Sequence, residues 1–483
     1  MSFRVCISLV CAAFLFVQSL VGQETDGLSA VSLPVEERSW EGASGAQESI
    51  DQTMPKDKDS IADQIGELRK QWEEFKKANA KKKSPVTVKV IGRIHADYWG
   101  FPNSTGGVNF FENPTTGVDP EDRILFRRLR IGVQGDIFET MLYKLEMEFA
   151  NPNNPTIKDA YLGFKELPIL QTVLIGNQKR PLGLDHWNSS RYNVFMERPL
   201  VVEAFNQDAR RLGIASYGYN EAETMNWQFG IYALEDTQGN GSYIGDALQL
   251  SFNNRLVVIP WYDETSGGRG YLHLAIANMV ADPNGNPDPG DADANEARFR
   301  TRPELRTTNR WLNTGRIANA DWFDVLAFEY MLNIGAFSVV AEYQNAWVTR
   351  KGAANPSLFF PGWYVYVAYF LTGEHQPYDR RKGALARLKP FEDFFLVRCC
   401  DGSRGTGWGA WQIAVRFSNL NLSDNDILGG RENNVTFAVN WWWNDHARLQ
   451  FNYVLGDIRN HAPVGGFTAG SFSGLGFRAM VDF

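Results

Sequence analysis

From residue 86 onward, hydrophobic and polar residues alternate along the chain with a period of two. In 86–98 the apolar side chains share one face and the polar side chains share the other: Val86, Val88, Val90, Ile94, Ala96 and Tyr98 against Thr87, Lys89, Arg93, His95 and Asp97. Segments 126–134 and 143–149 repeat this alternation, again with charges on one face. Such strands fit a wall with lipid on one side and a polar lumen on the other. The pattern predicts an all-β fold.

Sixteen segments show this strand signature, which predicts a sixteen-stranded antiparallel transmembrane β-barrel with both ends periplasmic. They are 86–99, 123–138, 140–150, 156–166, 170–180, 208–219, 224–235, 246–260, 270–281, 323–333, 336–348, 362–373, 407–418, 433–443, 446–457 and 470–483. A further candidate, 297–306, is rejected because it would place the short link 333–336 on the outside. Segment 282–322 then becomes one external loop, and 374–406 becomes a long periplasmic connection whose basic residues favour folding into the lumen.

The two ends of the chain carry sorting signals. At the C-terminus, Leu475, Phe477, Ala479, Val481 and Phe483 alternate with polar residues. This terminal strand resembles the signal of the outer-membrane assembly machinery, with Phe477 and Phe483 as its aromatic residues. At the N-terminus, Arg4 and a long apolar run predict a cleaved signal peptide, 1–22. An uncleaved anchor is the alternative.

Between the signal peptide and the barrel, two further segments are expected. Residues 23–58 are polar and rich in Pro, Ser and Glu, which predicts a disordered linker. In 59–83 apolar residues recur at spacings of four and three, which predicts a short periplasmic α-helical coiled coil for oligomerisation: Ile61, Ile65, Leu68, Trp72 and Phe75. The alternative is a helix that packs on its own domain.

Composition agrees with a barrel and excludes several function classes. The chain has 15 Trp, 17 Tyr, 32 Phe and 44 Gly, and after the N-terminus no apolar run reaches the roughly 18 residues of a membrane helix. Only Cys399 and Cys400 remain after signal cleavage, either as a vicinal bridge or as two thiols. No zinc spacing, phosphate-binding glycine loop or nucleotide fingerprint occurs. The sequence therefore predicts no enzyme activity, metal, cofactor or nucleic-acid partner.

Two weaker signals have simpler explanations. The acidic segment 282–296 could bind a divalent cation, but it lacks the fixed ligand positions of a calcium loop, and a solvated turn explains it. His186 with Ser189 and Ser190 invites a hydrolase interpretation, but no partner Asn or Asp is indicated.

The basic residues of the barrel are clustered, although its net charge is −6, with 29 Arg and 8 Lys against 43 Asp and Glu. Arginine offers a planar fork of donors that suits oxyanions. The alternative is that these residues pair with carboxylates and hold loops in place. The predicted anion path comprises Arg298, Arg300, Arg302 and Arg306 in the external loop, Arg380, Arg381, Lys382, Arg387 and Lys389 in the periplasmic segment, Lys179 and Arg180 beside the third loop, and Arg93, Arg128 and Arg130 on lumen-facing strand positions.

Ordered blocks over 86–483 resemble the phosphate-selective porin O/P family. They include FRRLRIGVQGDIFE (126–139), IKDAYLGF (157–164), GNQKRPLGLDHWNSSRYNVFMERPL (176–200), RRLG (210–213), RTRPELR (300–306), YFLTGEHQPY (369–378), GAWQIAVRFSNLNL (409–422) and VNWWWN (439–444). The resemblance implies a trimeric porin of the bacterial outer membrane, in contact with its lipid. Two external loops and one periplasmic segment would narrow the pore, and some members carry an N-terminal coiled coil.

The resemblance also implies passive diffusion of small inorganic anions, with phosphate or polyphosphate as candidates. It associates phosphate specificity with lysines at the constriction, and no matching lysine trio is evident among the eight lysines of the barrel. Anion selectivity is therefore the firmer expectation. The alternative is a structural outer-membrane protein that links the membrane to the cell wall and conducts little.

Overall fold

The computed structural model describes residues 66, 67, 70, 86–151, 153–206, 209–236, 248–286, 294–395, 397–398 and 402–483. The chain divides into two units, 1–80 and 81–483. In the first unit Gly66, Glu67 and Lys70 are helical. The predicted signal peptide 1–22, the linker 23–58 and the coiled-coil positions Ile61, Ile65, Leu68, Trp72 and Phe75 lie outside the described residues, so these domain assignments stay predictions.

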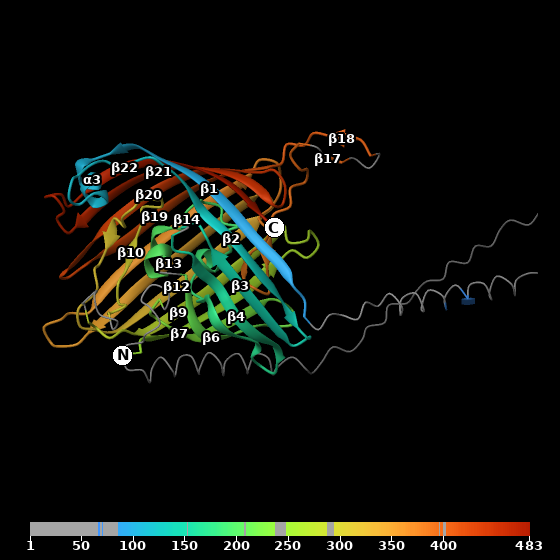
Figure 1. Ribbon diagram of the computed structural model, residues 1–483, viewed down its shortest axis with the longest axis horizontal. Coiled ribbons are helices and arrows are strands. Elements are labelled where there is room, and N and C mark those ends of the chain that lie inside the picture. Colours follow the sequence, from blue (N-terminus) through green and yellow to red (C-terminus); the bar gives the residue numbers. More distant parts are fainter. Residues whose placement is uncertain are drawn as a thin grey trace, which may run out of the picture. The chain divides into compact units, whose positions relative to one another are not determined.

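The second unit is a closed barrel of sixteen antiparallel strands, in which β22 pairs with β1 (Figure 1). The strands are β1 (Lys89–Ser104), β2 (Arg123–Ile137), β3 (Met141–Glu148), β4 (Thr156–Leu167), β5 (Gln171–Lys179), β6 (Arg210–Tyr219), β7 (Met225–Ala233), β8 (Leu250–Tyr262), β9 (Gly270–Asp282), β12 (Ala320–Ile334), β13 (Phe337–Arg350), β14 (Leu358–Phe370), β19 (Ala410–Asp424), β20 (Ile427–Trp442), β21 (Ala447–His461) and β22 (Gly470–Asp482). The predicted strand number and order are confirmed. The rejected segment 297–306 contributes only β10 (Arg300–Thr301), which pairs with β11 (Leu312–Asn313) outside the barrel sheet.

Alternation along the strands separates the outer wall from the lumen. On β14, Tyr364 and Phe370 are buried inside, whereas Trp363 and Tyr369 are exposed outside. The inner face of this strand is aromatic because it packs on the connection between β5 and β6, where the rings of Phe195 and Tyr366 lie 5.4 Å apart. An inward-folded loop thus replaces water as the neighbour of this lumen face.

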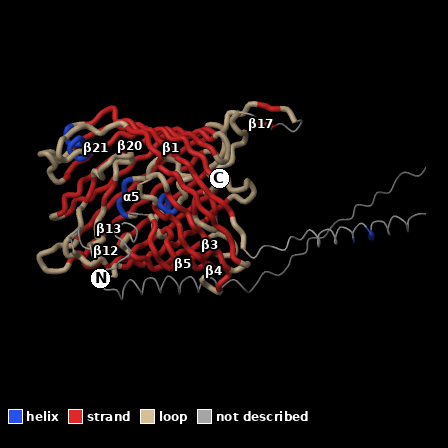
Figure 2. The backbone as a smooth tube through the Cα atoms, viewed as in Figure 1, coloured by secondary structure: helices blue, strands red, loops and turns tan. Residues whose placement is uncertain are grey.

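Two connections at the rim opposite the C-terminus fold into the barrel, as Figure 2 shows for α5. The β5–β6 connection, 180–209, carries α4 (Leu184–Trp187) and α5 (Leu200–Phe205). The β9–β12 connection, 283–319, packs on it, and the ring of Phe299 lies 5.3 Å from that of Phe205. At the same rim, α3 (Gly106–Glu112) follows β1. Together these connections form the apolar core inside the wall.

At the other rim, only the first half of the β14–β19 connection enters the lumen. It contains β15 (Tyr378–Asp379) and β16 (Ala384–Leu385), and Arg255 of β8 donates to the Gly383 carbonyl at 2.9 Å. The second half, with β17 (Val397–Arg398) and β18 (Arg404–Gly405), projects past the barrel rim (Figure 1). The expectation that 374–406 folds inward therefore holds only for its basic half. The projecting half carries exposed aromatic residues, Phe391, Phe395 and Trp408.

Barrel closure places the C-terminal residue against a glycine. Gly92 and Phe483 exchange backbone hydrogen bonds of 3.0 and 3.2 Å. A Cβ at Gly92 would lie 2.3 Å from the Phe483 ring, so a larger residue here would require that ring to move. Phe477 and Phe483 are exposed on the outer wall, and their role as an assembly signal stays a prediction.

Candidate functional site

A β-bulge on β2 brings two consecutive arginines into the lumen. His95 of β1 pairs with Arg128 and Ala96 pairs with Phe126, so Arg127 has no partner of its own on β1. An extra residue of this kind interrupts strict alternation. Phe126 faces outward and is exposed, while Arg127 bonds Glu197 of the inserted loop in bidentate fashion at 2.7 and 2.8 Å. The predicted site residues Arg128 and Arg130 therefore have Arg127 beside them.

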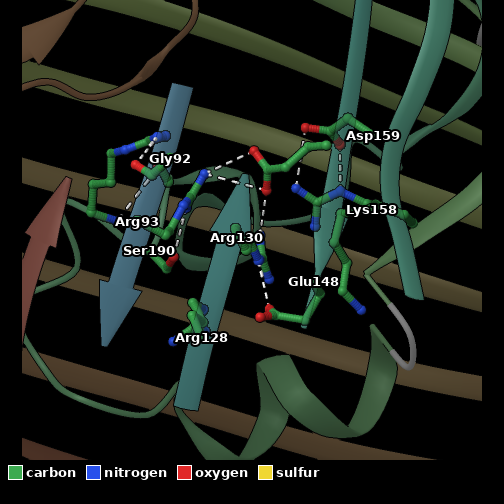
Figure 3. Close-up of polar contacts among 12 residues, drawn as sticks. Gly92, Arg93, Arg128, Arg130, Glu148, Lys158, Asp159 and Ser190 are labelled. Carbon is green, nitrogen blue, oxygen red and sulfur yellow. Dashed lines mark hydrogen bonds and ion pairs between the residues drawn. The ribbon is translucent and has the colours of Figure 1, made fainter. Parts of the chain in front are cut away.

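A second bulge, on β4, acts in the same way. Leu145 of β3 pairs with Ala160 and Met147 pairs with Ile157, so two residues, Lys158 and Asp159, stand opposite Glu146. Ile157 is exposed on the outer wall, whereas Asp159 is buried inside. Figure 3 shows Lys158 and Asp159 beside Arg130 and Glu148. Two bulges on nearby strands thus concentrate charge on one part of the wall, and strict period-two counting missed Arg127 and Lys158.

On this wall, Glu146 and Asp159 each contact more than one cation (Figure 3). Glu146 bonds Arg93 at 3.1 Å and Arg130 at 2.8 Å, and Arg130 also bonds Glu148 at 2.6 Å. Asp159 pairs with both Lys144 and Arg210. The cations nevertheless outnumber the carboxylates: Arg93, Arg127, Arg128, Arg130, Lys144, Lys158, Lys179 and Arg210 against Glu146, Glu148, Asp159 and Glu197. We call these eight cations and four carboxylates together the cationic wall.

The β5–β6 connection lies directly against the cationic wall. The Arg93 guanidinium donates to the Ser190 hydroxyl at 2.9 Å, a contact drawn in Figure 3. The Lys179 ammonium donates to three carbonyls of the connection, those of His186, Trp187 and Asn188, at 2.8 to 3.1 Å. Two of the predicted path residues therefore contact the element that narrows the lumen.

Buried carboxylates hold both inserted connections in place. Glu342 of β13 accepts from the Leu184 and Asp185 amides at the start of α4, at 3.0 and 2.7 Å. Glu304, in the β9–β12 connection, accepts from the Leu200 amide at the start of α5 and from Arg416 of β19. A carboxyl oxygen at a helix start accepts from amides that lack intrahelical partners. The lumen is therefore narrowed by segments that are fixed to the wall.

The electrostatic surroundings of Glu197, in the β5–β6 connection, differ from those of Arg306, in the β9–β12 connection. Burial raises the pKa of Glu197, but the charge and hydrogen bonds of Arg127, aided by Arg478, outweigh burial and hold that pKa well below its ordinary value. In the β9–β12 connection, Arg127 and then burial lower the pKa of Arg306 to about 9. Arg306 thus lies in a positive field where an added anion would be stabilised.

The four predicted external-loop arginines occupy two places. Arg298 and Arg300 line a cavity of about 330 Å³ together with Arg310, Asn309 and Asn313. Arg302 bonds Glu203 of α5 at 3.2 Å, while Arg306 lies deeper, within the field of Arg127. This connection therefore carries positive charge from the rim toward the cationic wall.

The basic segment at the C-terminal rim is largely neutralised. Arg380 bonds Glu264 at 2.5 Å and Glu223 at 3.3 Å, and Arg381 bonds Glu223 at 2.6 Å. Lys382 pairs with Asp379, and Arg387 with Asp482. This arrangement matches the alternative of arginines that hold a loop in place.

Arg128, in the cationic wall, contacts His95 at 3.4 Å. Of the other predicted path residues, Arg180 is buried beside the sulfur of Met279, and Lys389 is exposed. Sequence reasoning also missed Lys144 and Arg210, both on lumen-facing strand positions. The sequence does contain a signal for these two residues, because each lies at a polar position of an amphipathic strand.

Several other expectations can be compared with the structure. Within the described ranges, no group of three or more His, Cys, Asp or Glu could hold a metal ion. No hydrogen bond joins His186 to Ser189 or Ser190 in this part of the chain. No described helix is long and apolar enough to cross a membrane. Cys399, Cys400 and the middle of the acidic segment, 287–293, lie outside the described residues.

A family model described as phosphate-selective porin O and P matches residues 88–483, which include nearly all of the barrel. The chain belongs to this family. It is 28% identical over 347 residues to an uncharacterized protein of Caulobacter vibrioides, covering 70% of this chain and 64% of that one, and therefore spans just under two thirds of that relative. Porin O of Pseudomonas aeruginosa is 23% identical over 400 residues, covering 76% of this chain and 82% of its own.

Among solved structures, the fold is similar to an anion-selective porin from Comamonas acidovorans, with a TM-score of 0.49 and 12% identity over 82% of this chain and 100% of that one. The outer membrane channel DcaP of Acinetobacter baumannii has a TM-score of 0.47 and 12% identity over 83% and 99%.

Proposed function

We propose that this protein is an outer-membrane porin through which small anions diffuse passively. The observation that carries the proposal is the cationic wall beside the inserted β5–β6 connection, in a chain that belongs to the phosphate-selective porins. An ion that enters a narrow lumen gives up part of its water, and the lining must replace it. Guanidinium and ammonium donors replace the water of anions and repel cations.

Conduction also requires weak binding, and the carboxylates of the wall supply it. Glu146, Glu148 and Asp159 already occupy donors of Arg93, Arg130 and Arg210. A passing anion competes with these carboxylates, so no site holds it at full strength. Arg302 and Arg306 would attract anions at the outer rim. The segment around Arg380 is neutralised by carboxylates, so anions that leave the pore there would bind it only weakly.

Phosphate is a narrower proposal than anions in general. Lys144, Lys158 and Lys179 come from adjacent strands β3, β4 and β5, which brings three of the eight barrel lysines to one wall. Lys144 pairs with Asp159, and Lys179 donates to three carbonyls. We therefore propose inorganic anions as the solute class, with phosphate and polyphosphate as members to be tested.

The setting of the pore follows from family membership. We propose a homotrimer in the bacterial outer membrane, surrounded by lipid and delivered by the outer-membrane assembly machinery after removal of a signal peptide. The N-terminal coiled coil would lie in the periplasm and support the trimer.

Planar-bilayer recording of the purified protein in a salt gradient tests the proposal. The reversal potential should show anion over cation preference, and a cation preference would overturn it. Arg93→Gln combined with Arg130→Gln should reduce the preference several-fold. Arg404→Gln, which removes an exposed arginine on the projecting hairpin, should leave it unchanged and serves as the matched control.

A structural role with little conductance is the second candidate, and the observation that favours it is the lumen filled by three inserted segments. Single-channel conductance separates the two candidates, because a plugged barrel gives no resolvable current. Deletion of 23–83 would then harm envelope integrity more than solute uptake.

A further inference from the structure

The cavity of about 330 Å³ at the rim opposite the C-terminus combines two kinds of lining. One part is cationic or hydrogen-bonding, with Arg298, Arg300, Arg310, Asn309 and Asn313. The other part is apolar, with Phe111, Pro114, Leu428 and Val464. Among the described residues that line this cavity, none is acidic. The volume lies at the small end of the range for ligand sites, and we call the cavity the rim pocket.

The β9–β12 connection supplies all three arginines of the rim pocket. Arg298 and Arg300 are two residues apart in an extended segment, so they share one face, while Phe299 between them is buried on the other. Arg300 pairs with Asn313 across β10 and β11, and the Arg298 Nε donates to the Asn313 side-chain oxygen at 3.1 Å. Arg310 lies in the loop that joins β10 to β11. One short hairpin thus brings three guanidiniums to one pocket.

The carboxylates near the rim pocket have partners outside it. Glu112 is 2% exposed, accepts from two backbone amides of the connection and pairs with Arg123 at 3.3 Å. A carboxylate oxygen of Glu203 lies 4.0 Å from Arg310 but only 3.2 Å from Arg302. The three guanidiniums of the pocket are therefore only partly offset by negative charge.

The pKa of Arg298 reports the same excess of positive charge. Burial lowers this pKa, and the charges of Arg316 and Arg310 lower it further, against the opposing effect of Glu296. A cation whose pKa is lowered by other cations lies in a positive field. An anion added at this place would relieve the repulsion among the arginines.

The apolar part of the rim pocket comes from other elements of the same rim. Phe111 belongs to α3, and its ring lies 4.4 Å from that of His461, which also lines the pocket. Leu428, at the start of β20, is 49% exposed, so the pocket opens to the outside. Apolar surface of this kind gains free energy when a ligand removes it from water. A bare inorganic anion would leave this part of the pocket unused.

We infer that the rim pocket binds a small organic phosphomonoester, that is, a phosphate that carries an alkyl or aryl group. Its phosphate would contact Arg298, Arg300 and Arg310, and its apolar group would lie on Phe111 and Leu428. A phosphomonoester offers three acceptor oxygens and nearly two negative charges, which suits three guanidiniums better than a carboxylate does. The inference adds a ligand class to the inorganic anions of the proposed function and does not depend on conduction.

Isothermal titration calorimetry of the purified full-length protein, with phenyl phosphate as the probe, tests the inference. Wild type should bind phenyl phosphate several-fold more tightly than inorganic phosphate, and it should not bind phenol. Arg298→Gln with Arg300→Gln should weaken binding of phenyl phosphate by about tenfold or more, because charge-assisted hydrogen bonds are lost. Leu428→Asn should weaken binding of phenyl phosphate but not of inorganic phosphate. The control Arg459→Gln removes an exposed arginine of the same rim that does not line the pocket, and it should bind like wild type.

The inference is overturned if wild type does not bind phenyl phosphate, or binds it no more tightly than inorganic phosphate. This comparison uses wild type alone, so it decides the matter even if the double variant does not fold. The inference is also overturned if Arg93→Gln with Arg130→Gln abolishes binding, because the probe would then occupy the lumen at the cationic wall. Loss of anion preference in the bilayer assay would instead refute the proposed function and leave binding at the rim pocket intact.

Discussion

Glu197 is the residue whose removal should most affect the inserted β5–β6 connection. Its carboxylate bonds Arg127 twice, at 2.7 and 2.8 Å, and Arg478 once, at 2.9 Å. The substitution Glu197→Gln keeps the size of the side chain but removes its charge. Arg478 retains Asp97 as a partner, whereas Arg127 loses the carboxylate that it contacts.

The magnitude follows from burial. Breaking a buried ion pair by removing one partner costs roughly 3–5 kcal/mol, because the other charge stays buried. Arg127 is 21% exposed, so partial hydration lowers the expected cost to about 3 kcal/mol. That value corresponds to a factor of roughly 150 in the equilibrium for local opening of the connection.

Hydrogen exchange followed by mass spectrometry measures this opening directly. Peptides from 188–206 should exchange about a hundredfold faster in Glu197→Gln, while peptides from β19 to β21 should be unchanged. The double variant Arg127→Gln with Glu197→Gln should recover part of the protection, because it leaves no unpaired charge at that pair. Equal exchange in wild type and Glu197→Gln would refute the assignment of Glu197 as the anchor.

The pH dependence has a defined sign. Because the folded state holds the pKa of Glu197 well below its ordinary value of 4.5, its stabilisation is fully present above pH 4.5. It is lost only as the pH falls further, through the lowered pKa. Wild-type protection of this connection should therefore stay constant from pH 7 to about pH 5 and decline in stronger acid.

Three further predictions concern the pore and its closure. Because the pKa of Arg306 is about 9, the anion preference should fall as the pH rises from 8 to 10, and Arg306→Gln should abolish that part of the decline in bilayer recordings. Glu223→Gln should raise the anion preference, because it frees Arg381 and leaves Arg380 with Glu264 as its only ion-pair partner at the C-terminal rim. Glu221→Gln on the same turn should leave the preference unchanged, and an unchanged reversal potential in Glu223→Gln would contradict this reasoning. Gly92→Ala should slow barrel closure, measured as the rate of conversion to the heat-modifiable folded form on gels, since its Cβ would meet the Phe483 ring; wild-type rates would contradict the close-contact argument.

The strands could be predicted from sequence because each has one face in lipid and one in the lumen. Strand number and order followed from that alternation, and 297–306 was excluded because it would place the short link 333–336 on the outside. The same rule failed at Arg127, because a bulge turns a nominally outward position inward. The rule also did not predict the aromatic inner face of β14, where Tyr366 packs on a loop and does not face water.

The charge pairing could not be predicted, because the partners come from distant parts of the chain. Arg380 and Arg381 form a dense basic cluster in sequence, yet Glu223 and Glu264 from two other turns neutralise them. Arg93 and Arg130 share Glu146, which lies on β3. Local sequence shows where cations cluster, and only the closed barrel shows which of them retain an excess of charge.

The two bulges also set the distance between neighbouring charges. Along a regular strand, consecutive lumen-facing residues are two positions apart, about 6.6 Å at roughly 3.3 Å per residue. At Arg127 and Arg128, and at Lys158 and Asp159, that step shrinks to a single residue. At the first bulge two cations follow one another along the wall, whereas at the second a cation is followed by the Asp159 carboxylate, so only the first bulge offers an anion two consecutive positive charges.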